Sequence, residues 1–417
     1  MKKILALVLA AVMVFALAAC GSSTAPASAP AAAPADNTAS APEAAPAGAK
    51  VIKVGVFEPT SGQNAAGGKK EILGIEYAHS LYPTVNIGGE EYQIELVTAD
   101  NGSDSAKAPS AAQLLISNDV SVVVGTYGSG CAIAGGEYFA KAKIPAVGTS
   151  CTNPQVTQGN DYYFRVCYID PFQGAVMASY ALKNGCKNCV VIVEAGDDYS
   201  AGFGNYFSEA MKEGGAACDT VTFQTGETDF STIMANIKSK GYDGIFAPVS
   251  IETAPLIINQ ARENGVDCQI MAGDTWDDSS IASRAGENAN GVFFSCFFDQ
   301  TDTSNAAGAE FVKGFLEWVN ADATRIENNG GKDNGGDVAI SSVTPCGYDA
   351  YMAAYNALLK AQSTDGEAIR EALASLEVEG LVTGDLKFDD NGDAVKNYVA
   401  IKTFQDGNIV FSDAYTG

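Results

Sequence analysis

The sequence has only one histidine, His79, among its 417 residues. Histidine is the side chain that most readily moves protons near neutral pH, and it is the most common metal ligand. His79 lies in the first stretch with helical character, far from the polar loops described below. We therefore expect no catalytic residues and no metal site, and the protein is predicted not to be an enzyme.

Basic residues are also scarce. Lys and Arg together number 25 against 50 for Asp and Glu, which gives a formal net charge of -25. A strongly negative surface repels the phosphates of nucleic acids and anionic lipid headgroups. We expect no nucleic-acid partner.

Long hydrophobic runs are absent after residue 19. Residues 4–19 form one apolar run, which follows two lysines and is shorter than the roughly 20 residues of a membrane helix. The run ends in LAACG, which resembles the lipobox of bacterial lipoprotein signal peptides. That resemblance implies a signal peptide over 1–19, cleavage before Cys20 and acylation of its thiol. An ordinary secretory signal with a chance cysteine is the alternative.

Residues 20–50 are predicted to be a disordered tether. Beyond Cys20 they contain Ala, Pro and Ser with little else, a composition that cannot bury a core. We expect the lipid anchor to be the only membrane contact. The folded body would then work on the extracytoplasmic face of the cell membrane, in a periplasm or at the cell surface.

Nine of the ten cysteines follow Cys20. Cys186 and Cys189 have the spacing of a redox pair, but Cys189 begins a strand instead of a helix, whose N-terminus would lower a thiol pKa. We interpret the pair as a local disulfide or as buried thiols.

The body after residue 50 alternates apolar strands with helices, a pattern typical of parallel sheets covered on both faces. The pattern restarts after residue 170, which predicts two doubly wound α/β lobes. The C-terminal part has the turn signals Asn391-Gly392 and Asp406-Gly407 of antiparallel strands. The expected strands include 52–57, 92–100, 120–125, 144–150, 189–195, 221–225, 243–249, 268–274 and 291–298, and the expected helices 69–82, 105–117, 132–142, 201–213, 230–239, 253–263, 306–319, 347–361 and 366–375.

Two loops rich in glycine and hydroxyls follow neighbouring predicted strands. Residues 125–130 (GTYGSG) contain Ser129, and residues 148–154 (GTSCTNP) contain Thr152. Free N–H groups and the positive end of a following helix favour an anion. Since parallel neighbours end at the same edge, the two loops should converge on a carboxylate. A tight turn and N-capping by Thr152 are the structural alternatives.

The glycine spacing matches no nucleotide fingerprint. It is neither G-x-G-x-x-G nor a P-loop, and no lysine follows. We therefore expect no cofactor.

Strand ends in the second lobe carry an acid and two aromatics. Asp274 could pair with a ligand ammonium or cap a helix. Tyr199 is expected near the cleft or partly exposed in a loop, and Trp276 in the core or in the cleft wall. Anion donors on one lobe and a carboxylate on the other match a zwitterion. A ligand that contacts both lobes would draw them together.

From residue 51 to about 400 the chain resembles the substrate-binding lipoproteins of branched-chain amino acid ABC transporters, the leucine/isoleucine/valine-binding type. The matching stretches are IKVGVFEPTSG, VVVGTYGSG, IPAVGTSCTNP, YYFRV, DDYSAGFG, TDFSTIM, IINQARENG, MAGDTWDD, GYDA and GDLKFDDNGD. The resemblance implies a type I periplasmic binding fold with three hinge crossovers near 170, 299 and 398. The N-terminal lobe would comprise 51–169 and 299–397, and the C-terminal lobe 170–298 and 398–417.

The resemblance also implies roles for individual residues. Ser129 and Thr152 would hold the ligand α-carboxylate, while the Ser150 carbonyl and the Asp274 carboxylate would take the α-ammonium. Tyr199 would close over the ligand. Three further residues are expected at the cleft: Tyr127, Ser250 and Trp276.

The chain departs from the family where aromatic bulk is expected. Residues 66–68 (AGG) and Ser250 stand where aromatics often line the side-chain pocket, so a larger or more polar amino acid is an alternative to an aliphatic one. Asp104 and Gly128 occupy the places of the family's first-lobe disulfide. Cys131 and Cys151 lie in adjacent loops and could pair or stay free.

The leading hypothesis is a monomeric solute-binding lipoprotein that delivers an amino acid to ABC permease subunits. A sensory receptor module of the same fold is a second hypothesis, although nothing after residue 417 supplies a transmembrane or output segment. A binder of amides, short peptides or organic acids is a third, and a nucleotide-dependent enzyme built on the doubly wound sheet is a fourth.

Overall fold

The computed structural model describes residues 49–302, 305–332 and 336–416. They belong to one compact unit, Pro42–Gly417. The predicted signal peptide, Cys20 and nearly all of the predicted tether lie outside the described residues. The first strand begins at Lys50, the last residue of the expected tether.

The first sheet has six strands in the order β2-β3-β1-β4-β5-β6. All neighbours are parallel except β2, an edge strand that pairs antiparallel with β3 and that the sequence pattern did not reveal. The strands are β1 (Lys50–Glu58), β2 (Thr84–Ile87), β3 (Glu90–Asp100), β4 (Val122–Val124), β5 (Ala146–Gly148) and β6 (Tyr163–Arg165).

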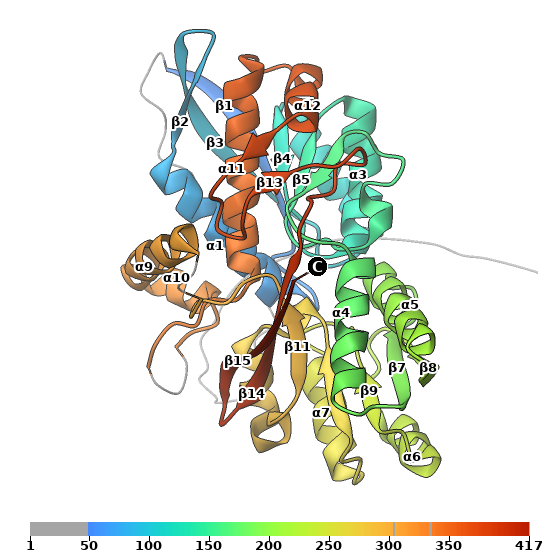
Figure 1. The fold of residues 1–417 in the computed structure, drawn as a ribbon. Helices are drawn as coiled ribbons and strands as arrows, with labels where there is room; N and C mark the ends of the chain where they lie inside the picture. Colours follow the sequence, from blue (N-terminus) through green and yellow to red (C-terminus); the bar gives the residue numbers. More distant parts are fainter. Residues whose placement is uncertain (1–48, 303–304, 333–335, 417) are drawn as a thin grey trace, which may run out of the picture. The chain divides into compact units, whose positions relative to one another are not determined.

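The second sheet has seven strands in the order β15-β14-β11-β10-β9-β7-β8. Strands β11, β10, β9, β7 and β8 are parallel, and a hairpin with the predicted Asp406-Gly407 turn adds β14 and β15 antiparallel at the edge beside β11 (Figure 1). A separate short pair joins β12 (Glu377–Val378) to β13 (Leu386–Lys387). The strands are β7 (Asn188–Glu194), β8 (Ala217–Phe223), β9 (Gly244–Phe246), β10 (Gln269–Ala272), β11 (Phe293–Cys296), β14 (Tyr398–Gln405) and β15 (Asn408–Thr416).

Helices cover these sheets, and most lie where the apolar periodicity predicted them. The sequence pattern missed α4, although Pro171 in its first turn is typical of a helix start, and it also missed the short helices α8 and α10. It placed the start of α1 late. The helices are α1 (Ala65–Leu81), α2 (Ala108–Ser117), α3 (Ser129–Ala142), α4 (Asp170–Lys183), α5 (Asp198–Glu213), α6 (Ser231–Lys240), α7 (Ala254–Glu263), α8 (Ser279–Ala285), α9 (Ala306–Asn320), α10 (Ala323–Asn328), α11 (Val343–Ala361) and α12 (Gly366–Ala374).

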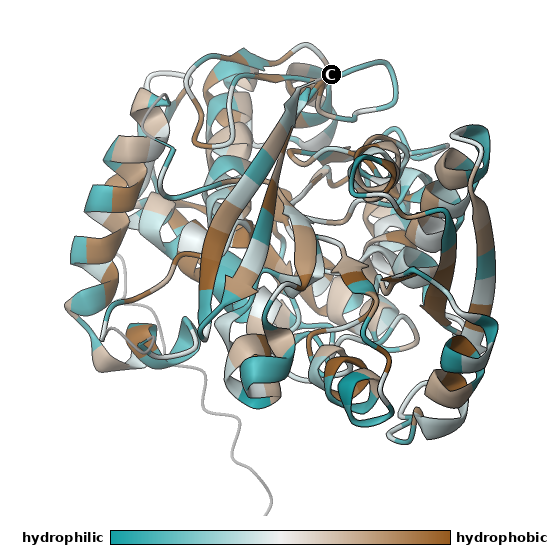
Figure 2. Ribbon diagram, turned by 60° about the horizontal axis from the view of Figure 1, so that its bottom comes forward, coloured by the Kyte–Doolittle hydropathy of each residue, from teal (hydrophilic) through white to brown (hydrophobic). Residues whose placement is uncertain are grey.

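The strands are apolar on both faces because both faces are buried. In β4, Val122 and Val124 pack into the core shared with α1 and α11, whereas Val123 packs into the core under α2 and α3. Figure 2 shows hydrophobic strands lying among helices that carry hydrophilic residues. This explains why the continuous valine run predicted a doubly covered parallel sheet correctly.

Helices α1 and α11 pack closely at two glycines. A Cβ on Gly74 would collide with the Thr344 carbonyl, and one on Gly347 would collide with the Glu71 carbonyl. The helix that follows β1 is thereby joined to a helix almost 270 residues further along the chain, which completes the first lobe.

Three segments connect the two sheets. Residues 166–168, 297–299 and 395–398, together with Asp302, line one cavity of about 460 Å³. They coincide with the regions where the crossovers were expected, and hinge motion about them stays a prediction. In the part of the chain that the structure describes, no helix is both long and apolar enough to cross a membrane.

All nine described cysteines are free thiols. Cys186 and Cys189 are buried, so the buried-thiol alternative fits this pair. Cys131 and Cys151 are likewise unpaired, and burial raises the pKa of each thiol to about 12.

A buried arginine fixes the loop after β5. The Arg165 side chain is fully buried and donates from Nε to Asp393 at 2.6 Å. Its Nη1 donates to the backbone carbonyls of Cys151 at 2.7 Å and Asn153 at 2.6 Å. Because Asp393 comes from the segment after β13, one guanidinium joins the hydroxyl-rich loop to a distant part of the chain.

Replacing Arg165 by methionine should lower the free energy of unfolding by about 3–5 kcal/mol, since Asp393 would remain buried without its cation. Urea denaturation measures the change. The control is Arg284→Met, which removes an exposed ion pair with Glu252 and should cost at most about 1 kcal/mol. Equal losses for the two variants would contradict a structural role for Arg165.

Candidate functional site

The two loops singled out from the sequence meet in space. Strands β4 and β5 are parallel neighbours, and the backbone N–H of Asn153 donates to Ser129 Oγ at 3.1 Å. Ser129 is the first residue of α3, and Gly128 before it has a φ of +102°, a conformation that favours glycine. The expected convergence of the loops at the carboxyl ends of the strands is therefore confirmed.

These loops form one wall of a small cavity whose other wall comes from the second sheet. About 20 Å³ of it is open to a water-sized sphere, which is room for about one water. The residues that line the cavity lie in the loops after β1, β4 and β5 of the first sheet and after β7, β9 and β10 of the second. The lining residues are Gln63, Asn64, Tyr127, Gly128, Ser129, Ser150, Asp197, Tyr199, Ser250, Asp274 and Thr275.

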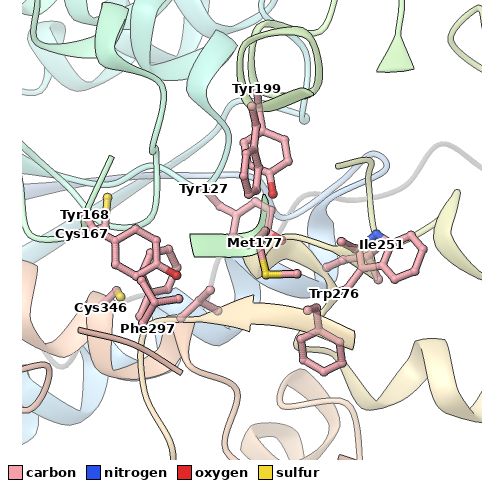
Figure 3. Close-up of a cluster of buried hydrophobic side chains, with 14 of the residues drawn as sticks. Tyr127, Cys167, Tyr168, Met177, Tyr199, Ile251, Trp276, Phe297 and Cys346 are labelled. Carbon is pink, nitrogen blue, oxygen red and sulfur yellow. The ribbon is translucent and has the colours of Figure 1, made fainter. Parts of the chain in front are cut away.

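Six of the eight residues expected at the site line this cavity, and Thr152 and Trp276 do not. Trp276 is fully buried, donates from Nε1 to the Val249 carbonyl at 3.1 Å, and belongs to the buried hydrophobic cluster of Figure 3. Thr152 is also fully buried, and within the part of the chain that the structure describes its hydroxyl has no hydrogen-bond partner. It lies near Asp170, whose pKa burial raises to about 6. Asn153, not Thr152, caps the following turn.

Asp274 is a carboxylate held by neutral donors only. One oxygen, Oδ1, accepts from Gln173 Nε2 and from the Tyr199 hydroxyl, each at 3.1 Å. The other, Oδ2, is buried and has no hydrogen-bond partner. Among the described residues no lysine or arginine forms an ion pair with it. Burial and the nearby Asp170 raise the pKa of Asp274 to about 7.

Asp274 is not the helix cap that the sequence left as an alternative. Gly273 precedes the short 3-10 turn of residues 274–276, and Asp278 caps α8 by accepting from the Ser280 N–H at 2.8 Å. The Asp274 carboxylate is therefore free to serve a ligand.

The two walls touch at the rim of the cavity. Asn153 Nδ2 donates to the Asp198 carbonyl at 2.7 Å, which links the loop after β5 to the start of α5. On another side, Lys70 of α1 forms a fully buried ion pair with Asp278 at 2.6 Å. Both contacts connect elements of the first sheet to elements of the second.

Two buried glutamates lie behind the first wall, and sequence reasoning missed them. The Thr149 hydroxyl contacts Glu58 at 3.2 Å and Glu71 at 2.6 Å, and Glu58 also accepts from the Tyr127 N–H at 2.8 Å. Burial raises the pKa of Glu71 to about 7 and that of Glu58 well above its usual range, with Glu71 adding to the second effect. The pair orients the loop that carries Tyr127.

Gln63, Asn64, Asp197 and Thr275 were also missed. Each of them follows the end of a parallel strand, so the rule that identified Ser129 and Asp274 could have found them. The signal is present in the sequence, but it does not by itself distinguish these four from the many polar residues of ordinary loops.

Two doubly wound sheets with polar loops facing each other at their strand ends define a protein that binds a small ligand between two α/β lobes. The chain belongs to the periplasmic binding protein family, whose family model matches residues 51–408. The fold and the family predicted from the sequence are thus confirmed.

Relatives and solved structures agree with this assignment. The chain is 27% identical to Leu/Ile/Val-binding protein homolog 1 of Brucella abortus, over 84% of this chain and 90% of that protein. The structure is similar to leucine-binding protein LivK of Thermotoga maritima, with a TM-score of 0.80, 32% identity and coverage of 88% of this chain and 99% of that one. It is also similar to LivJ of Streptococcus pneumoniae in complex with isoleucine (TM-score 0.75, 29% identity, coverage 88% and 99%).

The Asp274 carboxyl should titrate near pH 7 in the ligand-free protein. Tyr199→Phe should raise this pKa further, because the Tyr199 hydroxyl stabilises the ionised form. Carboxyl carbon NMR of aspartate-labelled protein measures both, with Asp274→Asn to assign the signal. Tyr138→Phe, on the outer part of α3, is the control and should leave the titration unchanged. A midpoint near 4 would contradict the observed environment.

Proposed function

We propose that this protein binds an α-amino acid in the cavity between the two sheets and delivers it to the permease of an ABC importer. The observation that carries the proposal is the buried Asp274 Oδ2, an unpaired carboxylate oxygen in the same cavity as the donors around Ser129. A zwitterion has the two charges that such a pair of walls can hold.

The Ser129 hydroxyl and the N–H groups at the start of α3 would hold the ligand carboxylate, aided by the helix dipole. Asp274 and the Ser150 carbonyl would take the ammonium. Tyr199 would cover the ligand while it keeps its hydrogen bond to Asp274. Thr152 would act indirectly, through its position beside Asp170, and Trp276 would support the wall from the core.

The small volume of the cavity supports a binding mechanism in which the two walls first separate to admit the ligand. A space of about 20 Å³ cannot admit an amino acid unless the walls separate. The rim hydrogen bond between Asn153 and Asp198 would break on opening and form again on closure. The three connecting segments would act as the hinge, and ligand contacts to both walls would favour the closed state.

Delivery to a permease requires an extracytoplasmic location, which is the location of this family. We infer that the body is held there as a monomer by acylation of Cys20 after removal of residues 1–19. Mass spectrometry of the N-terminal peptide from membrane fractions tests this: a diacylated or triacylated Cys20 supports the anchor, and an unmodified N-terminus contradicts it.

One amino-acid class should raise the melting temperature of the full chain. A ligand at a thousandfold excess over its Kd stabilises the native state by about 4 kcal/mol. Asp274→Ala should weaken binding at least about tenfold, because it removes a charge-assisted hydrogen bond. Asp161→Asn removes an exposed charge as the control and should bind normally. A folded protein that responds to no amino acid would refute the proposal.

Affinity should fall as the pH drops below 7, by about tenfold per pH unit, because only ionised Asp274 can pair with the ammonium. Calorimetric titrations between pH 8 and pH 5 measure the slope. Asp274→Asn separates this effect from the titration of Glu71, since the variant keeps any contribution of Glu71 and loses that of Asp274. An identical slope in the variant would assign the pH dependence to another group.

A further inference from the structure

A second cavity of about 350 Å³ adjoins the first. The two share five lining residues, which are Gln63, Asn64, Tyr127, Gly128 and Asp197. An amino acid whose head group sits beside Ser129 and Asp274 could therefore extend its side chain into the second cavity. The volume lies in the range of small-molecule sites.

The adjoining cavity has no aliphatic wall. Apart from Tyr127 and the Cys131 thiol, its lining consists of glycine, hydroxyl, amide and charged side chains; the residues not shared with the first cavity are Gly102, Ser103, Asp104, Ser105, Lys107, Gly130, Cys131, Glu194, Gly196, Asp198 and Thr225. The Tyr127 ring occupies the space above Gly67, where a Cβ would collide with it. This arrangement gives an aliphatic side chain little apolar surface to bury against.

The charges in this cavity are mostly negative. Lys107 is the only basic residue in the lining, and its Nζ lies 3.6 Å from Asp104 Oδ2. The charges of these two residues therefore compensate each other. Glu194, Asp197 and Asp198 form no ion pair with a lysine or arginine within the described ranges. Glu194 is only 2% exposed, and Asp197 packs beside it at the start of α5.

An unsatisfied acceptor faces the same region. Asn64 lines both cavities, and its Oδ1 is buried without a hydrogen-bond partner. One cavity lining thus combines an unpaired buried acceptor with three carboxylates, which is complementary to a group that both donates hydrogen bonds and carries positive charge.

We propose that the ligand is a basic α-amino acid of the lysine, ornithine or arginine type, whose cationic side chain lies in the adjoining cavity among Asn64, Glu194 and Asp197. The inference rests on the proposed amino-acid function and specifies its substrate class. It separates this chain from relatives named for leucine and isoleucine. Acidic amino acids would be repelled, and aliphatic ones would leave the carboxylates desolvated without a partner.

Calorimetry on the full chain with lysine, arginine, ornithine, norleucine, leucine and glutamine tests the proposal. Norleucine matches the lysine side chain without its ammonium. At least one basic amino acid should bind about tenfold tighter or more than norleucine, the factor expected for one charge-assisted hydrogen bond. Asp197→Asn and Glu194→Gln should reduce this ratio, while Glu137→Gln, on the exposed part of α3, should not.

Asp197→Asn is a mild substitution, because Asp197 caps α5 by accepting from the Ser200 N–H at 2.6 Å and asparagine caps equally well. Norleucine or leucine binding as tightly as the basic amino acids would overturn the substrate assignment and leave the amino-acid function intact. Binding of glutamine without binding of any basic amino acid would also overturn the substrate assignment. A folded protein that binds none of the six would instead refute the proposed function itself.

Discussion

The site depends on one electrostatic constraint: Asp274 is a buried carboxylate that forms no ion pair with a lysine or arginine of the described residues. Burial of an ion is costly unless it is paired, so such a group either takes up a proton or waits for a partner. Gln173 and the Tyr199 hydroxyl stabilise one oxygen, and the other is left without a donor. In the function that we propose, a ligand ammonium would supply both the missing hydrogen bond and the missing charge, and this would link ligand binding to closure of the two walls.

The remaining buried charges position the opposite wall. Arg165 holds the carbonyls of the loop after β5, and Glu58 holds the Tyr127 N–H of the loop after β4. Short polar loops have little packing of their own, so their shape has to be fixed from behind by groups that are fully buried. A buried ion pair also connects the two walls, between Lys70 and Asp278.

In the function that we propose, ligand specificity would arise where the strand ends carry no bulky apolar residue. Tyr127 lies over Gly67, and Ser250 lines the first cavity where aromatics are expected in the family. The space that results continues into a polar, acidic cavity. A head-group site of the kind expected for the family can coexist with a polar side-chain region, because the first depends on loops close to the sheets and the second on loops further out.

The sequence by itself determined the α/β class and the two lobes, and it identified six residues that line the candidate cavity. Apolar periodicity marks strands and helices, and the carboxyl ends of parallel strands collect polar loops at one edge, so Ser129, Ser150 and Asp274 could be identified from their places after strands. Only the tertiary structure decided that Trp276 is core, that Thr152 is buried outside the cavity, and that Glu58 and Glu71 lie together behind the wall. Those outcomes depend on side-chain direction and on contacts between segments distant in the chain, which strand periodicity does not encode.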